Sequence, residues 1–217
     1  MPEDIASRTR LCLVTRSAAD LAALTRSVGD ALSGGDVASL IVTGDPADPS
    51  FLQRAAQAFV PIAQNAGAAA MIHNDTQVAG RARADGVHVD GGMGDLRDAI
   101  ASFQPKRMVG AGEIHSRHDA MAIGELGPDY LFFGRLGDEA GDGIHAASLD
   151  LAGWWSTVTV IPAIVMGGRT VASVEEAARA GVEFVALSGA VWDDPRGPRA
   201  AVAEACERLA AMAEPAE

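Results

Sequence analysis

The sequence of 217 residues has few aromatic residues and few cysteines, and each shortage narrows the class of protein. Aromatic residues make up 5% of the chain, whereas hydrophobic residues make up 48%. The core is therefore built from Ala, Val, Leu and Ile, as in proteins of interleaved helices and buried strands. Cys12 and Cys206 lie far apart and form no CxxC spacing, which argues against a disulfide framework and against a zinc site. We expect Cys12 to be a small core residue in a strand.

Two kinds of segment are also missing from the sequence. No apolar run approaches the roughly 20 residues that are needed to span a bilayer. The first residues do not combine a basic region with an apolar core, so no signal peptide is expected. These absences predict a cytoplasmic protein with no membrane partner.

Basic residues are outnumbered, because 17 Lys and Arg stand against 29 Asp and Glu and give a net charge of −12. Nucleic acids are bound through basic surfaces, so this balance argues against nucleic acid as a general partner. A small phosphorylated ligand remains compatible with the charge, because a few local groups are enough to hold it.

Short apolar runs alternate with helical segments along the whole chain. The runs predict strands at residues 11–15, 37–42, 68–72, 86–89, 107–110, 129–133, 160–166 and 184–187. Four glycines each stand just before a strand, where we expect them to end the preceding helix: Gly67, Gly86, Gly127 and Gly181.

This alternation predicts an α/β fold of parallel strands joined by helices. Eight such units predict a single (β/α)₈ TIM barrel over residues 1–217, with residues 213–217 as a frayed tail. A doubly wound sheet is the alternative architecture. It would need a switch point, and no Gly-x-Gly-x-x-Gly follows the first predicted strand.

Small residues follow the last two predicted strands. Gly167 and Gly168 end the seventh strand, and Ser188 and Gly189 end the eighth. Backbone N–H groups at such strand ends hold a phosphate without side chains. In a barrel, the two strand ends lie side by side, so they predict a phosphate-binding cup.

Acidic and amide side chains follow the third and fourth strands. Asp75 and Asp90 together predict an Mg²⁺ site, because Mg²⁺ prefers hard oxygen ligands and a substrate phosphate. The alternative is that Asn74 and Asp75 only cap the next helix. His88 lies inside an apolar strand and is either a hydrogen-bonded core residue or a base.

Cationic side chains and histidines follow other strand ends. Arg135 and Arg169 are candidate clamps for an anion, with a solvated surface position as the alternative. His73 and His115 stand in loops as candidate proton carriers, although no acid is paired with either in the sequence. The acidic loop at residues 134–146 is either a solvated loop or a lid.

The chain resembles thiamine phosphate synthase and its relative, the TenI-type thiazole tautomerase, over essentially its whole length. The segments that carry the resemblance are residues 13–15, 34–35, 74–75, 84–89, 129–134, 161–162, 167–168 and 187–190. Together they are fairly specific for this superfamily.

The resemblance implies a (β/α)₈ barrel whose ligand is a phosphorylated heterocycle such as thiazole phosphate or thiamine phosphate. It implies that Gly167, Gly168, Ser188 and Gly189 bind the phosphate of the thiazole. It also implies that Asp75 ligates Mg²⁺. The family's second aspartate falls near residues 91–93, where Asp90 or Asp95 would substitute for it. Asn74 and Arg169 are expected to contact the substrate. In the synthase reaction, a hydroxymethylpyrimidine diphosphate loses pyrophosphate, and the thiazole nitrogen captures the resulting carbocation.

Three motifs of the family are replaced in this chain. Residues 40–44 stand where the family has a Gln-x-Arg-x-Lys pattern that grips the diphosphate. Acidic residues at 139–142 stand in place of a Thr-x-Thr-Lys segment, and Arg135 aligns with the catalytic histidine of the tautomerase. Each missing charge-assisted contact costs roughly 1.5–3 kcal/mol of diphosphate binding.

Three functions therefore stay open. The first is the synthase, with Arg16 or Arg135 replacing the lost cations. The second is a TenI-like enzyme on another phosphorylated heterocycle, with His115 or His73 as a proton carrier. The third is a non-catalytic barrel that binds a phosphate monoester. For Trp154 and Trp155 the alternatives are a homodimer interface or packing of their own helix.

Overall fold

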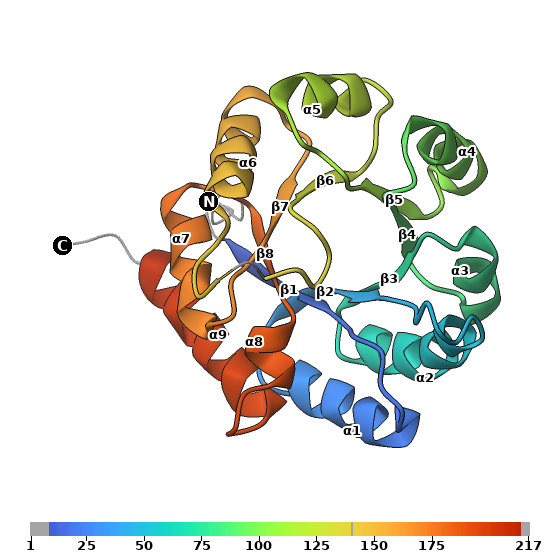
Figure 1. Cartoon of the computed structure of the whole chain (residues 1–217), viewed down its shortest axis with the longest axis vertical. Coiled ribbons are helices and arrows are strands. Elements are labelled where there is room, and N and C mark those ends of the chain that lie inside the picture. The colour runs from blue at the N-terminus through green and yellow to red at the C-terminus, as the bar shows by residue number, and fades with distance from the viewer. Residues whose placement is uncertain (1–8, 140, 214–217) are drawn as a thin grey trace, which may run out of the picture.

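The computed structural model describes residues 9–139 and 141–213, and its centre is a closed ring of parallel strands (Figure 1). Each strand pairs with its neighbours in the sequence, and β1 closes the ring by pairing with β8. The strands are β1 (Arg10–Val14), β2 (Val37–Val42), β3 (Ala69–His73), β4 (Gly86–Val89), β5 (Met108–Ala111), β6 (Tyr130–Phe133), β7 (Ala163–Met166) and β8 (Phe184–Leu187). The predicted (β/α)₈ TIM barrel is confirmed, and the doubly wound alternative is wrong because the closed ring leaves no sheet edge.

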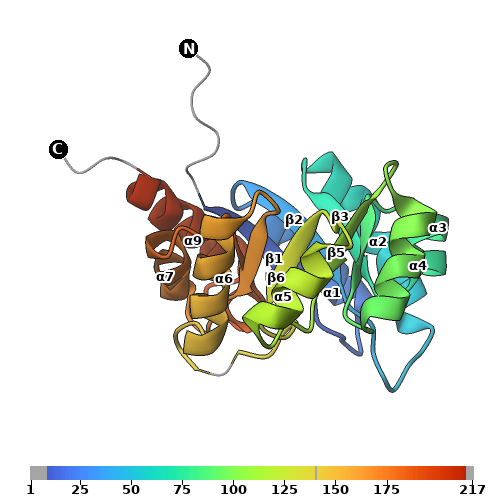
Figure 2. The same cartoon turned by 90° about the horizontal axis from the view of Figure 1, so that it is seen from above.

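Helices surround the ring on its outer side, as both views show (Figures 1 and 2). They are α1 (Leu21–Leu32), α2 (Phe51–Asn65), α3 (Thr76–Ala82), α4 (Met93–Phe103), α5 (Arg117–Gly124), α6 (Ala146–Val158), α7 (Val174–Arg179), α8 (Gly189–Trp192) and α9 (Pro198–Ala213), with the short 3₁₀ turn η2 (Val171–Ser173) before α7. Of the predicted frayed tail, Ala213 is helical and residues 214–217 lie outside the described part of the chain. No helix within the described ranges is long and apolar enough to cross a membrane.

Side chains of each strand alternate between two apolar layers, as the twofold period of a strand requires. Cys12 and Val14 of β1 point into the barrel, where they belong to one buried cluster with Phe132 of β6. Leu11 and Leu13 point outward into the larger cluster between strands and helices. Cys12 is 1% exposed, which confirms it as a core residue.

The seventh strand begins later than its apolar run predicts. Helix α6 continues to Val158, and the side chain of Val160 is 99% exposed, so β7 starts only at Ala163. Pro162 has no N–H to donate to a ladder, although its carbonyl oxygen accepts from the Leu131 N–H at 3.0 Å. Residues 160–162 therefore form a connecting segment, although their hydrophobicity predicts a strand.

The glycines before the strands are confirmed in three of the four predicted places. These three follow a helix with a positive φ: Gly67 at 81°, Gly127 at 79° and Gly181 at 70°. Gly86 has a different function, because it lies in β4, where a Cβ would come within 2.3 Å of the Met108 carbonyl oxygen. The left-handed residue that ends α3 is Arg83, at a φ of 57°.

The paired tryptophans of α6 pack on the barrel. Trp155 is 1% exposed, and its ring lies 6.5 Å from that of Phe133 in β6. Its indole N–H donates to the Ile161 carbonyl oxygen at 2.8 Å, which fixes the end of α6 to the start of β7. Trp154 is partly buried against the same core, and the Arg117 guanidinium lies 4.9 Å from the centre of its ring. Packing of their own helix thus explains both residues.

Candidate functional site

A cavity of about 610 Å³ opens at the carboxyl ends of β1, β2, β3 and β8 and beside the loop after β6. Four carboxylates line it, from Asp45, Asp48, Glu139 and Asp193, and among the described residues Arg16 is the lining guanidinium. Arg16 forms an ion pair with Asp193. The cavity lies where a barrel enzyme binds its substrate, but its charge is negative.

Asp48 places a negative charge in the loop after β2, where a diphosphate-binding site would need positive charge. Its carboxylate forms an ion pair with Arg54 at 2.7 Å and accepts from the Ser50 hydroxyl at 2.6 Å. The Arg54 guanidinium and the Ser50 hydroxyl lower the pKa of Asp48 to about 2, so the carboxylate stays ionised. The sequence predicts that this strand end lacks cations that bind a diphosphate. The structure adds that an ionised carboxylate, Asp48, lies there.

A tight polar cluster joins the ends of β3 and β4. Asp90 accepts from His73 Nε2 at 2.7 Å and from the Asn74 side-chain amide. In return, the Asn74 side-chain oxygen accepts from the Asp90 N–H at 2.9 Å. Burial raises the pKa of Asp90, but the hydrogen bonds from His73 and Asn74 outweigh it and lower the pKa to about 2. The cluster thus holds a permanent negative charge at the barrel mouth.

Asp75 has the local position that a helix cap requires. It is the N-cap of α3, and its Oδ1 accepts from the Val78 N–H at 2.8 Å. The capping alternative is therefore seen directly. Capping does not consume the carboxylate, since an ionised carboxyl group offers about four acceptor sites.

The two predicted metal ligands, Asp75 and Asp90, lie in consecutive loops, after β3 and after β4. Within residues 9–139 and 141–213, no group of three or more His, Cys, Asp or Glu side chains is arranged to hold a metal ion. Mg²⁺ is commonly held by only one or two carboxylates, with waters and substrate phosphates as its other ligands. Two carboxylates in adjacent loops are compatible with that arrangement.

His88 is a neutral imidazole inside the barrel. It is 1% exposed, its Nδ1 lies 3.0 Å from the Tyr130 hydroxyl, and its Nε2 has no hydrogen-bond partner among the described residues. Burial lowers the pKa of His88 to about 3, and the neighbouring His73 adds to the effect. This low pKa favours the core-residue interpretation over a base that works near neutral pH.

Arg135 and His115 meet on one carboxylate at the mouth of the barrel. His115 Nε2 lies 2.9 Å from Glu113 Oε2, and Arg135 Nε lies 4.0 Å from Glu113 Oε1. The side chains of His115 and Arg135 are 62% and 67% exposed. The structure therefore brings the two predicted catalytic residues together, through an acid that the sequence did not pair with either.

The first half of the predicted phosphate cup follows β7. The Gly167 N–H donates to the Ala186 carbonyl oxygen at 2.8 Å, so it belongs to the barrel ladder. The Gly168 N–H donates to the buried Ser173 hydroxyl at 3.0 Å. Ser173 was not predicted as a site residue, and its position at the start of a helical segment was the available signal.

The second half of the cup follows β8 and contains a carboxylate. The Ser188 N–H donates to Glu139 Oε1 at 3.2 Å, and the N–H groups of Gly189 and Ala190 lie near this carboxylate and favour its charged form. Burial raises the pKa of Glu139, and the three N–H groups oppose that rise. Arg169, predicted to contact substrate, donates from Nε to the Glu139 carbonyl oxygen at 3.3 Å.

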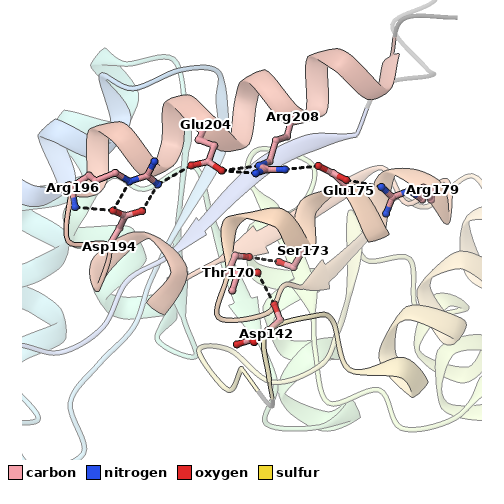
Figure 3. Close-up of polar contacts among 9 residues, drawn as sticks. All are labelled: Asp142, Thr170, Ser173, Glu175, Arg179, Asp194, Arg196, Glu204 and Arg208. Atoms are coloured by element: carbon pink, nitrogen blue, oxygen red, sulfur yellow. Dashed lines mark hydrogen bonds and ion pairs between the residues drawn. The ribbon is translucent and has the colours of Figure 1, made fainter. Parts of the chain in front are cut away.

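A row of ion pairs connects α7, α9 and the segment just before α9. Glu175 of α7 binds both Arg179 and Arg208, and the row continues along α9 (Figure 3). Its remaining links are Arg208 to Glu204, Glu204 to Arg196 and Arg196 to Asp194. Each exposed pair contributes little alone, but the network ties α7 to α9.

Comparisons with known proteins identify relatives of this chain. A family model described as thiamine monophosphate synthase matches residues 11–191. The thiamine-phosphate synthase of Hyphomonas neptunium is 35% identical over 201 residues, which cover 90% of this chain and 91% of that protein. The thiamine-phosphate synthase of Rhodospirillum centenum is 33% identical over 196 residues, which cover 90% and 95%.

Solved structures agree on the fold. A thiamine phosphate pyrophosphorylase from Pyrococcus furiosus superposes with a TM-score of 0.76 at 19% identity and covers 96% of this chain and 99% of that one. An archaeal Rubisco from Pyrococcus horikoshii, with a TM-score of 0.71 at 14% identity, shares the barrel over 97% of this chain and 59% of its own. Fold alone does not single out a family, but the sequence matches over most of the length do. The chain belongs to the thiamine monophosphate synthase family.

Proposed function

We propose that this protein joins hydroxymethylpyrimidine diphosphate to thiazole phosphate and releases pyrophosphate, forming thiamine phosphate. The observation that carries the proposal is the match to proteins named thiamine-phosphate synthase, at 35% and 33% identity over 90% of the chain. The position of the large cavity at the strand carboxyl ends supports it, because barrel enzymes work at that face.

The reaction breaks the bond between the pyrimidine methylene carbon and the diphosphate oxygen. Both bonding electrons leave with pyrophosphate, and the thiazole nitrogen then donates its lone pair to the methylene carbon. Negative charge develops on the leaving diphosphate, so catalysis depends on groups that are already arranged to neutralise it. When bound by Asp75 and Asp90, Mg²⁺ would supply part of that positive charge.

The chain's own residues take two parts in this proposal. Asn74 contacts the substrate from the loop after β3, where its backbone adopts a φ of 54°. Arg135 supplies a guanidinium for the departing diphosphate in place of the family's missing cations. Its side chain is 67% exposed and only 4.0 Å from Glu113, so its attachment is loose. Arg16 is the weaker replacement, because Asp193 already holds it.

The acidic cavity favours a second candidate, a barrel that binds a phosphate monoester without catalysis. Asp45, Asp48, Glu139 and Asp193 all line the space in which a diphosphate would bind. Carboxylates near a polyanion repel it, so this lining opposes the charged substrate that synthesis needs. The two candidates predict the same fold and differ in whether product forms.

The deciding experiment incubates the purified protein with both precursors and Mg²⁺ and measures thiamine phosphate by chromatography. The proposed synthase forms product, and Asp90→Asn and Arg135→Gln each reduce the rate by at least about 10-fold, since each removes a charge-assisted contact. Asp98→Asn is the matched control, because Asp98 is exposed on α4 and outside the lining of the 610 Å³ cavity. No product from a folded wild-type protein would overturn the synthase and leave the binding barrel.

A further inference from the structure

Glu139 brings a carboxylate from the loop after β6 into the turn after β8. Its Oε1 accepts from the Ser188 N–H at 3.2 Å, and the nearby Gly189 and Ala190 N–H groups also lower the pKa of this carboxylate. A Cβ placed on Gly189 would come within 2.4 Å of Glu139 Oε2. The absence of a side chain at Gly189 therefore allows the carboxylate to lie there. Three neighbouring donors on one acidic group form an anion site that is already filled from within the chain.

The same loop also covers the other half of the cup. A Cβ on Gly168 would come within 2.2 Å of the Asp142 carbonyl oxygen, because the loop backbone packs directly on this glycine. The Asp142 carbonyl oxygen also accepts from the Thr170 hydroxyl at 3.0 Å, as Figure 3 shows. Farther along, the Arg169 N–H donates to the Gly141 carbonyl oxygen at 2.8 Å. Residues of the loop therefore engage the strand end after β7 and the strand end after β8 together.

We propose that Glu139 is an internal competitor for the anion cup at Ser188, Gly189 and Ala190, so that a phosphate monoester binds there only by displacing this carboxylate. The inference rests on the phosphate site of the proposed function. Carboxylate and phosphate oxygens both accept hydrogen bonds and both carry negative charge, so they compete for the same donors. Sharing the cup would place two like charges within hydrogen-bonding distance, which is strongly unfavourable.

The other charged groups near the Glu139 carboxylate also disfavour the binding of an anion. Asp193 raises the pKa of Glu139, and a Cβ on Gly189 would lie 3.5 Å from Asp193 Oδ2. Arg16 faces this corner of the cavity, but it is ion-paired with Asp193. An incoming phosphate therefore meets two acidic side chains, while the Arg16 guanidinium is paired with Asp193 and the Arg169 guanidinium donates to the Glu139 carbonyl oxygen. Removing the charge of Glu139 is the change that opens the cup.

The test measures the affinity for inorganic phosphate by isothermal titration calorimetry in wild type, Glu139→Gln and Glu139→Ala. We expect both variants to bind phosphate at least about 10-fold more tightly than wild type, the effect of one charge-assisted contact. Asp138→Asn is the matched control, because it removes the same charge from the neighbouring exposed position. Its phosphate affinity should stay within about 2-fold of wild type. Glu139→Gln keeps the size of the side chain and preserves the test if Glu139→Ala does not fold.

A second measurement reports on the cup itself. In ¹H–¹⁵N spectra, Glu139→Ala should shift the amide signals of Ser188 and Gly189, and phosphate should move the same signals in Glu139→Gln at lower concentration than in wild type. Equal phosphate affinity in wild type and both folded variants overturns the proposal, and so does the absence of binding in all three. The outcome is separate from the synthase assay. A protein that forms no thiamine phosphate but binds phosphate more tightly after Glu139→Gln keeps this inference and loses the proposed function.

Discussion

Asp75 carries two predicted functions that substitution can separate. Its Oδ1 caps α3 by accepting from the Val78 N–H at 2.8 Å, and its charge is proposed to help bind Mg²⁺. Asparagine caps a helix about as well as aspartate, so Asp75→Asn should leave the free energy of unfolding within a few tenths of a kcal/mol. Asp75→Ala removes the cap and should cost about 1 kcal/mol, which corresponds to about 2–4 °C in Tm for a domain of this size.

Binding of Mg²⁺ should respond differently. Both Asp75→Asn and Asp75→Ala remove a charged ligand, which is worth about 1.5–3 kcal/mol, so each should weaken Mg²⁺ binding by about 10- to 100-fold. Stability is measured by urea unfolding. Metal binding is measured by electron paramagnetic resonance with Mn²⁺ and pyrophosphate, and by the Mg²⁺ dependence of product formation.

The control for Asp75 is Asp20, which caps α1 in the same way by accepting from the Ala23 N–H at 2.9 Å. Asp20→Ala should lower stability as much as Asp75→Ala and leave metal binding unchanged. Wild-type metal affinity in Asp75→Asn would refute the metal function. Wild-type stability in Asp75→Ala would refute the capping contribution.

Two further predictions concern the core and the cup. The pKa of His88 is about 3 in the folded protein and near 6.5 when unfolded, so the unfolded chain binds more protons between these values. The stability that neutral His88 provides is thus complete above pH 6.5 and falls by about 1.4 kcal/mol per pH unit as the pH drops towards 3. Urea unfolding at several pH values should show a smaller slope in His88→Gln. A slope equal to that of wild type would contradict the prediction. Gly168→Ala forces a Cβ against the Asp142 backbone and should cost about 1–3 kcal/mol of stability. Gly189→Ala meets the flexible side-chain ends of Glu139 and Asp193 and should cost less. Equal losses in thermal unfolding would contradict the packing of the loop.

The fold could be predicted because its signals are local and repeated. Buried strands such as residues 11–15 need apolar runs, and Gly67, Gly127 and Gly181 supply the positive φ that ends a helix before a strand. The error at β7 has the same origin, since the apolar run predicts a strand from Val160, which is 99% exposed. Strand register placed His73 opposite His88, which no local signal reveals.

The site could be predicted only in its residue types. His73 and His115 were both placed at strand ends, but their acidic partners, Asp90 and Glu113, are set by how separate loops approach each other. Loops have no periodicity from which such contacts follow. For the same reason, the carboxylate of Glu139 in the cup could not be derived from a charge run alone.

We propose that the chain is a working thiamine phosphate synthase, despite the acidic lining of its cavity. The most direct measurement follows thiamine phosphate and pyrophosphate together, with purified protein, both precursors and Mg²⁺. We predict that the two products appear in a one-to-one ratio, at a rate proportional to the protein concentration and lost in Asp90→Asn. Pyrophosphate without thiamine phosphate, or neither product from folded wild-type protein, would contradict the claim.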